Sequence, residues 1–200
     1  MLFAPSRAGV FRAWGLLFPL LFFVLMLALP WILDAAAGMT HKLYDQEMLA
    51  RVWDVVGLTY IMASAVALLL TLALMLSSRL ETPAKFVTIG FIQTLFVFTF
   101  FIQVAAGLQQ QPVQEAAVIA RQLSDKSVVA YGVHRPTFSV YRDAITPQDR
   151  SPEPGEVIFT DADNLLKLQQ RNPDAVFDLL FSKGGIRLVE WRDADPVVTN

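Results

Sequence analysis

The sequence predicts a membrane protein with three transmembrane helices followed by a small extracytoplasmic α/β domain. Two observations predict this class. Charged residues make up only 17% of the 200-residue chain, whose mean hydropathy is +0.47, whereas about 25% of an ordinary soluble domain is charged. The charges are also unevenly spread, because three long stretches contain none and most of the charged residues follow residue 108.

The charge-free stretches cover residues 13–33, 55–78 and 86–108. Each is longer than the roughly 18 apolar residues that indicate a membrane span. Because backbone polar groups must be paired within the segment in hydrocarbon, we expect all three to be helical. Cleavage of the first stretch as a secretory signal at Ala35-Ala36-Ala37 is an alternative. Its apolar run exceeds the roughly 7–15 residues of a signal core, so we predict an uncleaved span.

The basic residues predict the orientation of these spans. Arg7 and Arg12 precede the first span, and the 79–85 link carries two basic residues and one acidic residue. The 34–54 loop also carries two basic residues, but with four acidic ones. The positive-inside rule therefore places the N-terminus and the 79–85 link in the cytoplasm. The 34–54 loop and the chain after residue 108 are then extracytoplasmic.

The outer loop at 34–54 contains apolar residues at helical spacing. We predict an amphipathic helix that lies at the membrane surface and runs into the second span. Its apolar residues are Leu43, Tyr44, Met48, Leu49, Val52 and Trp53. On this view the membrane domain comprises residues 1–108, with the loop included, and the second domain comprises residues 109–200.

Residues 109–200 have the pattern of a small layered α/β domain. A linker at 109–112 precedes a predicted α-β-α-β-α-β-β order. The predicted elements are a helix at 113–123, a strand at 127–132, a short helix from Pro136, a strand at 156–160, a helix capped by Asp161 or Asp163 that ends near Arg171, and a hairpin of 176–181 and 186–191 around Ser182-Lys183-Gly184-Gly185. Phe138 and Tyr141 share one side of the short helix, so we expect them to pack it onto the sheet.

Several short motifs in this order resemble the C-terminal end of membrane glycosyltransferases of the C-type fold. The quoted motifs are QEAAVIARQL, VVAYG, HRPTFSVYRD, VIFTDADNLL and FSKGGIRLVEW. The similarity is greatest to the polyprenyl-phosphate-sugar-dependent group, which includes aminoarabinose transferases and protein mannosyltransferases. The resemblance extends over residues 13–191. It implies a location in the bacterial inner membrane, with the last spans leading into an extracytoplasmic α/β domain.

The resemblance also implies what this chain lacks. Complete members of that family have many more spans, and their catalytic carboxylate lies in the first extracytoplasmic loop. We therefore expect the chain to be a fragment, a split subunit or a remnant, inactive alone. Its expected partners are the bilayer and either a polyprenyl-phosphate sugar or a larger glycosyltransferase subunit. The alternative function is that of a non-catalytic, membrane-anchored interaction module or an assembly subunit of an envelope glycosylation system.

Few residues qualify as site candidates. Glycosyl transfer needs a carboxylate as general base, and Asp34, Asp45 and Glu47 lie on the predicted outer side. A solvated loop face is the simpler interpretation of these three residues, and Asp45 and Glu47, two residues apart, do not share a helix face.

Three basic residues are weak candidates for binding a ligand. His134 and Arg135 stand between a predicted strand and a helix N-terminus, where anions bind, and Arg142 follows in the same motif. A structural turn contact is the simpler interpretation of the His-Arg pair. The two histidines have no metal-ligand spacing, and cysteine is absent. We predict no metal and no cofactor, and the net charge of -2 does not favour a nucleic-acid partner.

Overall fold

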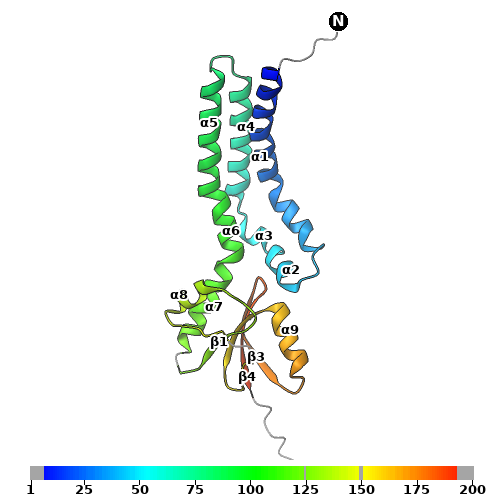
Figure 1. Ribbon diagram of the computed structural model, residues 1–200, viewed down its shortest axis with the longest axis vertical. Helices are drawn as coiled ribbons and strands as arrows, with labels where there is room; N and C mark the ends of the chain where they lie inside the picture. Colours follow the sequence, from blue (N-terminus) through cyan, green and yellow to red (C-terminus); the bar gives the residue numbers. More distant parts are fainter. Residues whose placement is uncertain (1–6, 124, 149–150, 193–200) are drawn as a thin grey trace, which may run out of the picture. The chain divides into compact units, whose positions relative to one another are not determined.

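The computed structural model describes residues 7–123, 125–148 and 151–192 (Figure 1). Within these residues the chain forms two compact units. One comprises the residues up to Leu33 together with Trp53–Ala105, and the other comprises Asp34–Val52 together with the residues from Ala106 onward. We call them the helical unit and the α/β unit.

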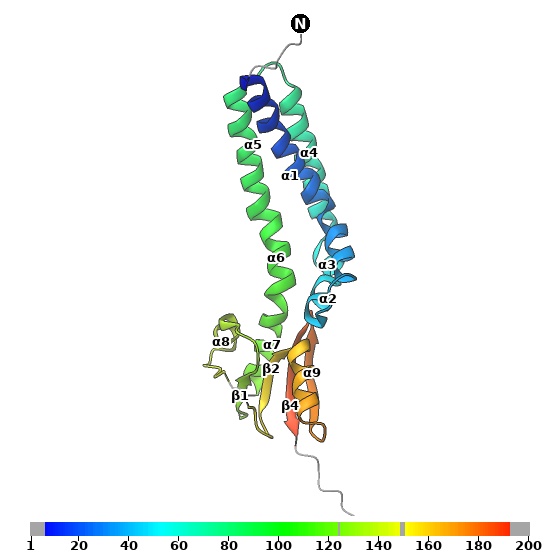
Figure 2. The same ribbon diagram turned by 45° about the vertical axis from the view of Figure 1, so that its right-hand side comes forward.

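The helical unit contains three helices that are long and apolar enough to cross a membrane. The candidate spans are Leu17–Ala37, Leu58–Leu76 and Thr82–Gln109, which confirms the three predicted spans. They belong to α1 (Arg7–Ala37), α4 (Leu58–Leu76) and a continuous helix made of α5 (Thr82–Phe96), the π-helical turn η1 (Val97–Phe101) and α6 (Ile102–Gln109). Figures 1 and 2 show α1, α4 and α5 running side by side.

Aromatic side chains hold the three long helices together. The rings of Phe23 and Tyr60 lie with their centroids 5.6 Å and 5.7 Å from that of Phe96. The Tyr60 hydroxyl donates a hydrogen bond of 2.9 Å to the carbonyl of Met26. Elsewhere these helices expose many large apolar side chains, as expected of segments that contact lipid tails.

A mixed four-stranded sheet forms the centre of the α/β unit, with strand order β1-β2-β4-β3. The strands are β1 (Val128–Ala130), β2 (Val157–Asp161), β3 (Val176–Lys183) and β4 (Ile186–Arg192). β1 and β2 are parallel and are connected through α8 (Pro136–Arg142), whereas β4 is antiparallel to both of its neighbours. The predicted hairpin is confirmed, but β3 extends to Lys183, so the turn is Gly184 and Gly185, both with positive φ angles, instead of the four residues 182–185.

Helices cover both faces of this sheet (Figure 1). Side chains alternate between faces along a strand, and β2 follows this rule. Val157 and Phe159 belong to one buried cluster with α8 and α7 (Gln111–Gln122). Ile158 points to the opposite face, where it packs beneath α9 (Ala162–Arg171). The predicted α-β-α-β-α-β-β order is therefore present.

Two predicted boundaries differ from the structure. The expected linker at 109–112 is reduced to Gln110, because α6 ends at Gln109 and α7 begins at Gln111; Pro112 stands in the first turn of α7, where a missing N–H costs nothing. The 34–54 loop does not form one helix that runs into the second span. It forms α2 (Leu43–Leu49) and α3 (Val52–Val55), and Asp34–Val52 groups with the α/β unit.

Candidate functional site

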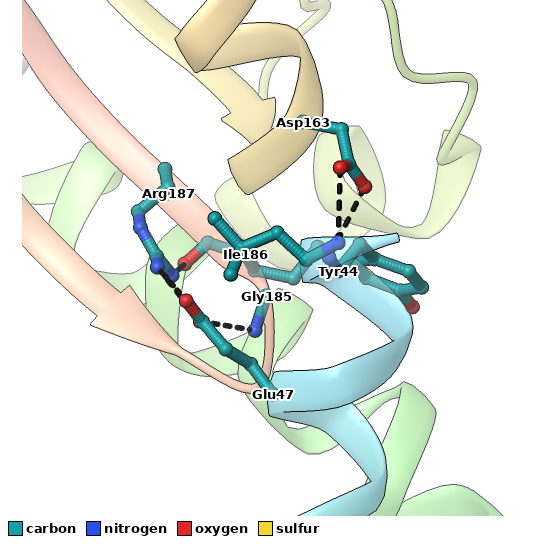
Figure 3. Close-up of polar contacts among 7 residues, drawn as sticks. Tyr44, Glu47, Asp163, Gly185, Ile186 and Arg187 are labelled. Atoms are coloured by element: carbon teal, nitrogen blue, oxygen red, sulfur yellow. Dashed lines mark hydrogen bonds and ion pairs between the residues drawn. The ribbon is translucent and has the colours of Figure 1, made fainter. Parts of the chain in front are cut away.

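The short helix α2 is held against the hairpin of the α/β unit by Glu47 (Figure 3). Its carboxylate accepts two hydrogen bonds from Arg187 Nη2, at 2.5 Å and 2.7 Å. The backbone N–H of Gly185 donates a third, at 3.2 Å. The side chains of Arg187 and Glu47 are 13% and 31% exposed. Such a charge-assisted pair, partly removed from water, is about twice as strong as a neutral hydrogen bond.

The N-terminus of α2 is capped from another helix. The Asp163 carboxylate accepts hydrogen bonds from the backbone N–H groups of Leu43, at 3.0 Å, and Tyr44, at 3.1 Å (Figure 3). These two groups are among the first donors of α2, which have no partner within the helix. Asp161 caps α9 itself through the N–H of Asn164. Of the two aspartates predicted as alternative caps of α9, Asp161 is therefore the cap.

Tyr44 joins α2 to the connection between β1 and α8. Arg135 Nη2 donates a 2.8 Å hydrogen bond to the Tyr44 hydroxyl, and its guanidinium carbon lies 5.5 Å from the ring centroid, within the range of a cation–π contact. Together with Glu47 and Asp163, this contact explains why the 34–52 segment belongs to the α/β unit. Of the apolar residues of this predicted amphipathic helix, Tyr44 packs against the buried cluster of the α/β unit.

The three predicted carboxylates have different surroundings. Glu47 is bound by Arg187 and by the backbone N–H of Gly185. Asp45 is half-buried and lines an open depression of about 660 Å³ that also contains Lys42, Asp161 and Asp163. Asp34 is an exposed residue near the end of α1. The depression is wide open to solvent and its acidic residues include two helix-capping carboxylates, so it does not have the form of a water-restricted catalytic cavity.

The three predicted basic residues also lie in separate environments. His134 is exposed, with Nδ1 3.4 Å from Gln148 Nε2. Arg135 contacts Tyr44. Arg142, at the end of α8, donates to the Ile145 carbonyl and to the Thr146 hydroxyl, and partial burial lowers the pKa of its guanidinium from the ordinary value. Arg135 and Arg142 therefore have structural contacts, which leaves His134 facing solvent.

His134 lines a groove that the sequence did not indicate. The groove has a volume of about 590 Å³, and its basic residues are His134, Lys167 and Arg171. Lys167 and Arg171 are separated by one helical turn on α9, so they share a face of that helix. This spacing was visible in the sequence, but basic residues on the polar face of an amphipathic helix ordinarily contact only solvent.

Within residues 7–123, 125–148 and 151–192 no group of three His, Asp or Glu side chains could hold a metal ion. The fold and these sites define a class: a protein with three candidate membrane spans and a small mixed α/β unit whose contacts include the segment between the first two spans. Comparisons with protein-family models, with curated proteins and with solved structures found no match.

Proposed function

We propose that this chain is the C-terminal membrane and extracytoplasmic part of a polyprenyl-phosphate-sugar-dependent glycosyltransferase of the C-type fold, and that it supports catalysis without performing it. The observation that carries the proposal is the order of elements. A helix, a strand, a short helix, a strand, a helix and a hairpin follow three candidate spans, and this is the order that the sequence resemblance implies. A membrane-anchored interaction module is the alternative, and binding to a larger glycosyltransferase subunit distinguishes the two.

The state of the carboxylates supports a non-catalytic role. A general base must be within hydrogen-bond reach of the acceptor and free to take its proton. Glu47 instead accepts three hydrogen bonds, two from Arg187 Nη2 and one from the Gly185 N–H. Asp34 is exposed. Asp45 faces an open depression, where water would compete with the acceptor. Positioning supplies much of the rate of such a transfer, and none of these three sites offers it.

The first prediction is that the purified chain transfers no sugar. Reconstituted in proteoliposomes with polyprenyl-phosphate sugars and a lipid or protein acceptor, it should give only the background of empty liposomes. Asp34→Asn and Asp45→Asn should give the same background. Turnover that disappears in either variant would contradict the proposal and make the 34–54 segment an active site.

An experiment with a partner subunit distinguishes the two non-catalytic roles, a supporting part of a glycosyltransferase and an interaction module. Co-expression with a glycosyltransferase subunit that carries the remaining spans should yield a stable complex in which transfer is measurable. If the chain binds no such subunit, the supporting role is refuted. A complex whose transfer rate does not change when this chain is removed would instead favour the interaction module.

The second prediction concerns orientation, for which the basic residues near the span ends are the support. The N-terminus and the 79–85 link should be cytoplasmic, and the α/β unit extracytoplasmic. Alkaline phosphatase fused after Asn200 in a bacterial host should be active, because that enzyme needs an oxidising compartment to form its disulfides. An inactive fusion, together with an active cytoplasmic reporter at the same point, would reverse the orientation.

A further inference from the structure

The groove lined by His134, Lys167 and Arg171, which we call the cationic groove, lies beside the parallel strands of the α/β unit. Tyr131, Gly132, Val133 and His134 follow directly after β1, and α9 follows directly after β2. The groove thus lies where the carboxyl ends of two adjacent parallel strands lead into their connections. Open α/β sheets bind ligands preferentially at this position.

The hydrogen-bond partners of Lys167 and Arg171 are neutral, although Lys167 also lines the depression that contains Asp45, Asp161 and Asp163. Lys167 Nζ donates to Asn164 Oδ1 at 3.3 Å, and Arg171 Nη1 donates to the Tyr131 hydroxyl at 3.3 Å. Among the described residues no carboxylate lines the groove or pairs with these two side chains. By contrast, four other cations of the α/β unit have carboxylate partners within 2.7 Å: Lys126, Lys183, Arg187 and Arg192.

The backbone beneath these cations is fixed by Gly132 and Asn164. Gly132 has a φ of +68°, and a Cβ built there would lie 2.6 Å from Asn164 Cγ. Asn164 Nδ2 donates to the Gly132 carbonyl at 3.0 Å and to Asp161 Oδ2 at 2.9 Å. The strand end and the first turn of α9 are therefore held together before any ligand arrives, which lowers the entropic cost of binding.

We propose that the cationic groove binds an organic phosphate. Lys167 and Arg171 supply two positive charges from one helix face, and a guanidinium matches the geometry of phosphate oxygens. His134 lines the same groove and supplies a third polar group. The groove is open to solvent, like the depression beside Asp45, and its volume of about 590 Å³ leaves room for an organic body attached to the phosphate. The inference uses only the α/β unit and does not depend on the proposed glycosyltransferase role.

The test uses the full chain in maltoside micelles, which contain no phosphate. Calorimetric titration with glycerol 3-phosphate should show saturable binding to one site. Removing a charged hydrogen-bond donor costs about tenfold or more in affinity, so Lys167→Met and Arg171→Gln should each weaken binding by at least that factor. Arg121→Gln removes an exposed charge of α7 outside the groove, and this matched control should bind like the parent.

A second titration distinguishes a lipid headgroup from a soluble phosphate. Dioctanoyl phosphatidic acid should bind at least tenfold more tightly than glycerol 3-phosphate if the source is a lipid, and equally if the source is soluble. Either result supports the site, provided that both Lys167→Met and Arg171→Gln weaken it. Absence of saturable binding with both probes would overturn the proposal. A variant that combines Lys167→Met with Arg171→Gln, unfolds at the same temperature as the parent and binds the probes as tightly would also overturn the proposal.

Discussion

Gly185→Ala is expected to detach α2 from the α/β unit and to lower the free energy of unfolding by about 2–4 kcal/mol. Gly185 has a φ of +77°, and a Cβ there would lie 2.5 Å from Tyr44 Cδ2 and 2.7 Å from the Tyr44 carbonyl oxygen. Contacts below 3.0 Å with backbone atoms cannot be relieved by a rotamer change. To relieve the clash, α2 must move away from the β3–β4 turn, and this movement would break the hydrogen bond from the Gly185 N–H to Glu47.

Gly155→Ala provides the matched control for this effect. Gly155 also has a positive φ, +91°, but a Cβ there would meet no atom within 4 Å. It should therefore show only the cost of the left-handed backbone, about 1–2 kcal/mol. Thermal unfolding of the full chain in detergent measures the loss of stability, and hydrogen exchange of the α2 amides measures the detachment of α2. The prediction is wrong if the two variants melt together and the α2 amides of Gly185→Ala stay protected.

Local rules predicted most of the fold. Long charge-free stretches identified the three candidate spans, because hydrocarbon leaves a chain few alternatives to a helix. Ser182-Lys183-Gly184-Gly185 predicted a hairpin, and in the structure Gly184 and Gly185 form its turn with positive φ angles. Proline at the start of α8 and aspartate before α9 predicted those helix starts from backbone chemistry alone.

The docking of α2 could not be predicted in this way. The Glu47–Arg187 contact joins residues 140 positions apart, and the Asp163–Tyr44 contact joins residues 119 apart. Nothing in the local pattern distinguishes an amphipathic helix that rests on lipid from one that rests on protein, because both present one apolar face. The local sequence therefore predicts a solvated or catalytic carboxylate at Glu47, whereas Glu47 forms an ion pair with Arg187.

The cationic groove illustrates the same limit. Lys167 and Arg171 have the one-turn spacing of an ordinary helix surface, and only the fold brings them beside the chain after β1. Of the basic motif at 134–142, the sequence correctly placed His134 at a strand-to-helix connection. It could not show that Arg135 would bind Tyr44, since that partner belongs to a segment assigned to the membrane domain.

Phe138→Ala is expected to cost the α/β unit about 3–5 kcal/mol, the usual range for a buried phenylalanine. Phe138 is 1% exposed, and its ring stacks on Phe159 of β2 with centroids 3.8 Å apart. The truncation would leave a cavity between α8 and the sheet, which the neighbouring backbone can fill only in part. Since single domains have about 5–15 kcal/mol of stability, the variant should unfold many degrees earlier in a thermal melt.

Tyr141→Ala gives the comparison that isolates burial. The sequence grouped both aromatic residues as packing residues of the short helix, and both contact the same cluster, but Tyr141 is only partly buried. Less of the Tyr141 surface is removed from water on folding, so its truncation should cost less than that of Phe138. Both melts are read on the full chain in detergent against the parent. A Tyr141→Ala variant that melts as early as Phe138→Ala would show that the α8 contact depends on the tyrosine side of the helix, and that the Phe138–Phe159 stack contributes less than its burial implies.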